Sequence, residues 1–114
     1  MTTVRVASER AEAFSPEPGL VRRILAHNPN LMLVEHVMAK GWAGARHSHP
    51  HDQLVYVQSG RIRVSSGSDV FEAAAGDSFV VNGGTEHQAW ALEQSVVLDV
   101  FTPTRADYLP GRST

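Results

Sequence analysis

Short runs of strand-forming residues, each ended by turn residues, fill most of the chain. The expected strands are 20–25, 31–39, 53–58, 61–65, 70–73, 78–81, 87–92 and 95–101. Short strands separated by Gly, Pro, Asn, Asp and Ser are typical of β-sandwiches and barrels. No apolar run is longer than four residues, which is too short for a membrane span or a signal-peptide core. The sequence therefore predicts an all-β sandwich or barrel.

The length of 114 residues predicts a single domain. We expect a polar N-terminal arm over residues 1–19 with a short strand at 4–6, the β domain over 20–109, and a tail over 110–114. Ser59-Gly60 separates two expected strands and predicts a hairpin turn between them.

The charge balance argues against a nucleic-acid or membrane partner. Ten Lys and Arg residues and twelve Asp and Glu residues give a net charge of −2, and the basic residues are scattered. The chain has no cysteine, so disulfides, thiolate ligation and iron–sulfur clusters are excluded. We expect a soluble cytoplasmic protein, in which any metal is held by imidazole, amide, carboxylate or water.

Three of the six histidines lie within five positions, at His47, His49 and His51. Imidazole is the commonest protein ligand of transition metals. A His-x-His pair on an extended segment places both rings on one face, because side chains alternate along a strand. His47, His49, Gln53 and His87 would form a one-metal site if the fold returned the last beside the others. We assign His51 to the rim of that site.

Two spaced patterns surround these residues. G-x5-H-x-H-x3-Q-x6-G covers 41–60, and G-x5-N-x-G-x2-H covers 76–87. Together they resemble the two motifs of the cupin superfamily. The resemblance implies a single cupin barrel, a double-stranded β-helix of jelly-roll type. It also implies that His47, His49, Gln53 and His87 point inward and bind one divalent transition metal.

Gln53 stands where the family normally carries Glu. Three neutral imidazoles and a neutral amide leave the full charge on a bound ion, which favours Lewis-acid chemistry and disfavours oxidation of the metal. Such a ligand set suits Zn, Ni, Mn or Fe(II). The alternative is a degenerate pocket that keeps its histidines without a metal.

A second group of residues lies near the C-terminus. Val97, Asp99 and Phe101 share one face of an alternating run, and Arg105 follows. Burying a carboxylate among apolar side chains is costly unless it is paired or functional. Asp99 and Arg105 therefore form either a structural ion pair or a site that moves protons and binds a carboxylate. We expect His36, in a run of alternating residues, to be a hydrogen-bonded sheet residue.

The segments 47–53 and 98–109 resemble the KdgF-type cupins of pectin and alginate catabolism, over about residues 19–109. That resemblance implies metal-dependent ring opening of 4,5-unsaturated uronate monosaccharides, released by lyases, to linear keto-sugar acids. It assigns Asp99 as the acid/base, Arg105 as the residue that holds the substrate carboxylate, and Phe101 as a residue that shapes the pocket. It further implies a small acidic sugar as partner and a homodimer.

Two other functions remain open. One is a metal-dependent dioxygenase or a polyketide-cyclase-like cupin, which would act on a phenolic or polyketide substrate. The other is a non-catalytic cupin that binds a sugar acid without turnover.

Overall fold

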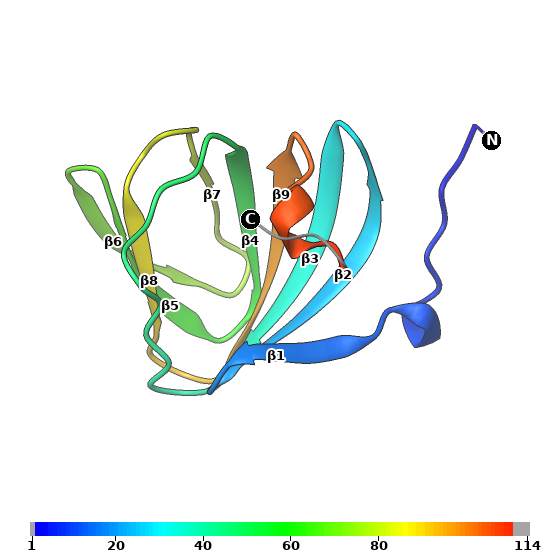
Figure 1. Cartoon of the computed structure of the whole chain (residues 1–114). Helices are drawn as coiled ribbons and strands as arrows, with labels where there is room; N and C mark the ends of the chain where they lie inside the picture. Colours follow the sequence, from blue (N-terminus) through cyan, green and yellow to red (C-terminus); the bar gives the residue numbers. More distant parts are fainter. Residues whose placement is uncertain (1, 111–114) are drawn as a thin grey trace.

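The computed structural model describes residues 2–110, and its regular structure is formed by β-strands and two short 3-10 helices (Figure 1). The strands are β1 (Ala13–Glu17), β2 (Leu20–Asn28), β3 (Leu31–Met38), β4 (Asp52–Ser59), β5 (Arg61–Ser66), β6 (Asp69–Ala74), β7 (Ser78–Val81), β8 (His87–Ala91) and β9 (Ser95–Thr102). Two short 3-10 helices, η1 (Ser8–Arg10) and η2 (Ala106–Tyr108), complete the described part. Neither is long or apolar enough to cross a membrane.

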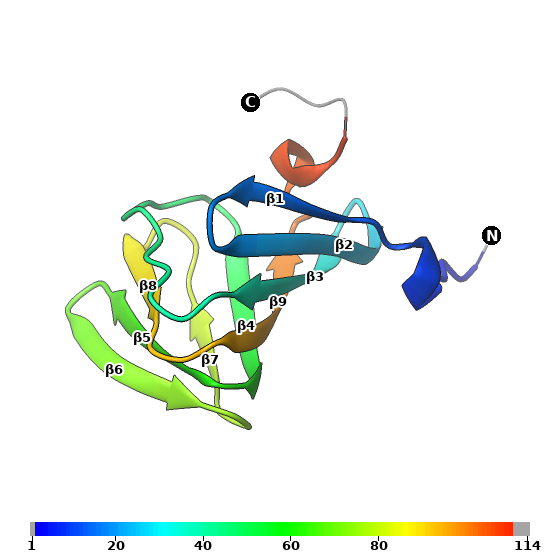
Figure 2. The same ribbon diagram turned by 90° about the horizontal axis from the view of Figure 1, so that it is seen from below.

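The strands form two antiparallel sheets. The larger sheet has the order β1-β2-β3-β9-β4-β7, and the smaller has the order β6-β5-β8. The sheets face each other and enclose the interior of a barrel (Figure 2). The predicted all-β barrel is confirmed. The expected tail lies, apart from Pro110, outside the described residues.

The hairpin predicted at Ser59-Gly60 is wrong. β4 pairs with β7 and β9 in the larger sheet, whereas β5 pairs with β6 and β8 in the smaller one. Gly60 has a φ of 85°, and a Cβ at this position would lie 2.3 Å from Ser95 Oγ. The glycine is required because the chain changes sheets in a tight turn against the start of β9.

The strand predicted at residues 4–6 is also wrong, since residues 2–7 have no regular structure. The strand in this region is β1, which pairs with the edge of β2 through Ala13↔Arg23 and Phe14↔Arg22. Pro16 is compatible with β1 because an edge strand has one side without sheet hydrogen bonds.

The two central strands of the larger sheet bring polar side chains into the interior. On β3 the buried residues alternate and include Val34 and His36, and on β9 they include Val97, Asp99 and Phe101. β3 and β9 are neighbours, so one apolar face carries a histidine and a carboxylate in its middle. The predicted alternation of residues 95–101 is therefore confirmed, and it positions the candidate site.

Candidate metal centre

Backbone hydrogen bonds bring the two histidine segments together. The His47 amide donates to the His87 carbonyl at 3.0 Å, and the His87 amide donates back to His47 at 2.8 Å. The connection between β3 and β4 thus runs beside β8 as an extended segment. His49, two residues beyond His47, lies on the same side of this segment. The expected return of His87 beside the His-x-His pair is what the structure shows.

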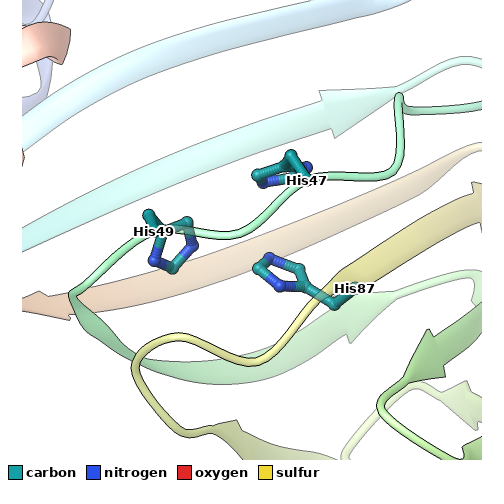
Figure 3. Close-up of side chains that lie close together, drawn as sticks. All are labelled: His47, His49 and His87. Carbon is teal, nitrogen blue, oxygen red and sulfur yellow. The ribbon is translucent and has the colours of Figure 1, made fainter.

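The three imidazole rings face a common space (Figure 3). One ring nitrogen from each of His47, His49 and His87 lies within 4.8 Å of the other two. His49 and His87 are buried, whereas His47 is exposed. This arrangement forms a three-histidine group able to bind a metal ion.

The second nitrogen of each ring is held by the backbone. Nδ1 of His47, His49 and His87 donates to the carbonyls of Ala45, His51 and Thr85 at 2.9, 3.1 and 2.8 Å. A proton on Nδ1 leaves the lone pair on Nε2, the tautomer that a metal-binding histidine needs. The rings are therefore oriented and protonated as ligands by their own segments.

The unpartnered atoms of the described side chains also fit a bound cation. His87 Nε2 and His51 Nδ1 are the buried side-chain polar atoms without a hydrogen-bond partner among the described residues, and both lie at this site. A buried nitrogen without a partner is costly unless something binds it. Burial, with the charge of Arg105 contributing, also lowers the pKa of His49 and His87, so both rings are neutral near neutral pH.

Gln53, on β4, completes this side of the site. Its Oε1 lies 3.1 Å from His49 Nε2, and its Nε2 donates to Asp99 Oδ1 at 2.8 Å. Because Asp99 accepts from the nitrogen end, the amide oxygen is directed toward the histidines. The structure thus brings all four predicted ligands together.

Asp99 is 3% exposed and has two donors, Gln53 and His36. His36 Nδ1 donates to Asp99 Oδ2 at 2.7 Å, while His36 Nε2 accepts from Arg22 Nε at 2.9 Å. The prediction that His36 is a hydrogen-bonded sheet residue is confirmed. The alternative of an Asp99–Arg105 ion pair is wrong, since the ionic partner of Arg105 is Asp107.

Arg105 is fixed by the C-terminal turn. Its Nη2 donates to Asp107 Oδ2 at 2.9 Å, and its Nη1 donates to the Tyr108 hydroxyl at 2.9 Å. Burial raises the pKa of Asp107, but the hydrogen bonds from Arg105 outweigh this and the net pKa is lowered.

Phe101 is 1% exposed, and its ring contacts the His49 ring edge-on at 5.8 Å. His51 is half-buried beside His49, at a ring separation of 5.5 Å.

A cavity of about 300 Å³ joins these groups. Five of the predicted site residues line it, namely His47, Gln53, His87, Asp99 and Arg105. Arg22 and His36 also line it, and sequence reasoning did not assign them to the site. The signal for Arg22 was its place between Leu20 and Ile24, because an arginine alternating with apolar residues on a strand can face inward.

Comparison with known proteins identifies the family. Residues 34–101 match the family model described as a cupin domain. The pectin degradation protein KdgF of Dickeya dadantii is 36% identical over 93 residues, which cover 80% of this chain and 84% of that protein. The structure of KdgF from a Halomonas species is 37% identical with a TM-score of 0.89, and the match covers 95% of this chain and 100% of that one. An RmlC-like cupin from Shewanella frigidimarina is 31% identical with a TM-score of 0.89, over 95% and 97% of the two chains. The chain therefore belongs to the cupin family, as a small cupin similar to the KdgF proteins.

Proposed function

We propose that this cupin is a metal-dependent enzyme that opens the ring of 4,5-unsaturated uronate monosaccharides and gives linear keto-sugar acids. Its similarity to the KdgF pectin degradation protein supports a role in pectin degradation. The observation that carries the proposal is the hydrogen bond between Gln53 and Asp99. It places a buried carboxylate one side chain away from the three-histidine group, and Asp99 lines the same cavity as His47 and His87.

His47, His49 and His87, together with Gln53, would hold one divalent ion, of Zn, Ni, Mn or Fe. When bound, the ion would supply Lewis-acid polarisation of substrate oxygens, which the neutral ligand set favours. The remaining chemistry belongs to the side chains of this chain.

Asp99 is the group that would move the proton. Both of its oxygens accept hydrogen bonds, from His36 Nδ1 and Gln53 Nε2, and these fix the orientation of the carboxyl group. In the proposed reaction the sugar C1 hydroxyl loses a proton, the C1–O5 bond breaks to leave a C1 aldehyde and an enolate at C4–C5–O5, and the enolate becomes a C5 ketone when C4 gains a proton. Asp99 takes the first proton and returns a proton to C4, so the step is an isomerisation with no net change in atoms.

Arg105 and Phe101 would bind the substrate. Arg105 lines the cavity with its guanidinium held by Asp107 and Tyr108, and its remaining N–H groups would donate to the sugar carboxylate. Phe101, packed against the His49 ring, would shape the pocket beside the ligands. A homodimer is a further part of the proposal, which rests on the family resemblance and which light scattering tests. A cytoplasmic location is also part of it and rests on the composition of the chain.

The direct test is to supply the unsaturated monosaccharide made by a pectate or alginate lyase. The loss of alkene absorbance should be faster with metal-loaded protein than with chelator-treated protein or with no protein. Equal rates in all three would contradict the proposal. Oxygen consumption with a phenolic substrate would instead indicate a dioxygenase, and saturable binding without turnover would indicate a non-catalytic cupin.

A further inference from the structure

Arg22 is an arginine on the cavity wall that belongs to neither cupin motif. It lies on β2 directly opposite His36 on β3, and it is half-buried. A charged side chain on the inner side of a barrel is costly unless it is paired or binds a ligand. The partners of its guanidinium group therefore indicate its role.

That guanidinium contacts one histidine and two aromatic rings, and its Cζ lies 5.9 Å from the centre of the Phe14 ring. Nε donates to His36 Nε2 at 2.9 Å, and Cζ lies 3.7 Å from the centre of the Tyr108 ring. Nη1 and Nη2 have neither a hydrogen bond nor an ion pair with any residue between 2 and 110. These two nitrogens carry most of the N–H donors of an arginine.

Arg105 differs from Arg22 in this respect. All three of its nitrogens already donate, Nε and Nη2 to Asp107 and Nη1 to Tyr108. The Asp107 carboxylate also offsets its charge. Of the two arginines that line the cavity, Arg22 offers the less compensated charge.

The carboxylates that line the cavity do not neutralise Arg22. Glu17 accepts a hydrogen bond from Trp42 Nε1 at 2.7 Å, and Asp99 accepts from His36 and Gln53. Neither carboxylate forms an ion pair with Arg22 in the described part of the chain. The wall at Arg22 thus combines a positive charge with two donor nitrogens that have no acceptor among residues 2–110.

We propose that Arg22 binds the carboxylate of the ligand through Nη1 and Nη2, and shares that single carboxylate with Arg105, which lines the same cavity. Its bond to His36 and its contact with Tyr108 hold the guanidinium in place, so little side-chain freedom is lost when the anion binds. Arg22 would then select acidic sugars over neutral ones. The inference rests on the proposed function only for the identity of the ligand as a uronate.

A binding experiment tests the anion site without turnover. Galacturonate is a saturated uronate that lacks the reactive alkene, and galactose is its neutral counterpart. By calorimetry the metal-loaded protein should bind galacturonate more tightly than galactose. Arg22→Gln should weaken galacturonate binding by about tenfold or more and leave galactose binding unchanged. Arg61→Gln removes an equal charge from an exposed position on β5 and should change neither.

Arg22→Lys separates anion binding from support of His36. Lysine keeps the charge but lacks the Nε donor, so an anion-binding role predicts partial retention of the galacturonate preference. A purely structural role predicts that Arg22→Lys weakens galacturonate binding as much as Arg22→Gln does. It also predicts that kcat falls in both variants while KM for the unsaturated uronate is unchanged. The anion-binding role predicts instead that KM rises by about tenfold in Arg22→Gln and less in Arg22→Lys.

A measurement on the unmodified protein covers the case in which the variants do not fold. Galacturonate should shift the Arg22 side-chain NMR signals more than those of Arg61, and galactose should shift neither. An absent preference for galacturonate, or an unmoved Arg22 signal, overturns the inference. Failure of turnover with normal galacturonate binding overturns the proposed reaction but supports the anion site.

Discussion

The two ends of the Gln53 amide have different environments. Its oxygen lies beside His49 Nε2, and its nitrogen donates to the Asp99 carboxylate. The neutral amide therefore occupies the position nearest the histidines, and the negative charge lies one hydrogen bond farther away. In that position, the proton transfer proposed for Asp99 would take place without a carboxylate among the four proposed metal ligands.

Replacement of Asp99 should remove activity and leave metal binding intact. Asp99→Ala removes the group that would move the proton, and loss of general acid–base catalysis typically costs about a hundredfold to ten-thousandfold in rate. The checks are turnover of the unsaturated uronate and metal content by emission spectroscopy. Asp69→Ala, which removes an exposed carboxylate on β6, is the control and should behave as the unmodified protein. Unchanged turnover in Asp99→Ala would give Asp99 a structural role.

Replacement of His87 should remove the metal. His87→Ala deletes the buried Nε2 that has no protein partner, and the remaining ligands would hold a divalent ion weakly. Metal content should fall from one ion per chain to near zero, while far-ultraviolet circular dichroism still shows a β protein. One ion per chain in the variant would contradict the ligand assignment.

At the level of the elements, the sequence predicted where the strands lie better than how they pair. The alternation of β9 predicted correctly that Val97, Asp99 and Phe101 share one face, and the structure shows that this face is the buried one. It could not predict the partner of Asp99, because His36 is 63 residues away on β3 and a local pattern carries no information about such a distance. An ion pair with the nearby Arg105 was one of the two interpretations left open by the sequence, but the turn at η2 gives Arg105 Asp107 as its partner instead.

Gly60 shows the same limit. Its turn was predicted, yet the sheet change was not, because a glycine signals a reversal and does not specify the next neighbour. Gly60→Ala should destabilise the protein by about 1–3 kcal/mol or more, since the φ is positive and the new Cβ would meet Ser95 and the Gln94 carbonyl.

Gly76→Ala is the matched control for that substitution. Its φ of 92° is similar, but nothing lies within 4 Å of the new Cβ. It should cost only the backbone strain, about 1 kcal/mol. Urea unfolding measures the free energy of unfolding of Gly60→Ala and Gly76→Ala. An equal decrease in the two variants would show that the contact with Ser95 carries no cost.

At the scale of the whole molecule, the histidine group should make the metal-free protein sensitive to acid. Burial lowers the pKa of His49 and His87 below the ordinary value of 6.5. As pH falls below 6.5, the unfolded chain binds protons that the folded chain does not. The free energy of unfolding should therefore be highest above this pH and decrease below it.

Urea unfolding of the chelator-treated protein on both sides of pH 6.5 checks this expectation. His87→Gln cannot titrate at that position and should lose less stability on acidification. A stability that rises as the pH falls through this range would contradict the sign of both shifts.

The ligand residues come from both sheets of the barrel. Gln53 lies on β4 of the larger sheet, His87 lies on β8 of the smaller one, and His47 and His49 lie on the connection that runs beside β8. An ion held by all four would act as a cross-link between the two walls. Loading with metal would then raise the free energy of unfolding by mass action, by about 2.7 kcal/mol when the free metal is at a hundredfold excess over the dissociation constant. The melting temperature would rise accordingly. Loading would also slow amide exchange along residues 41–49, whose backbone is hydrogen-bonded to β8 of the smaller sheet.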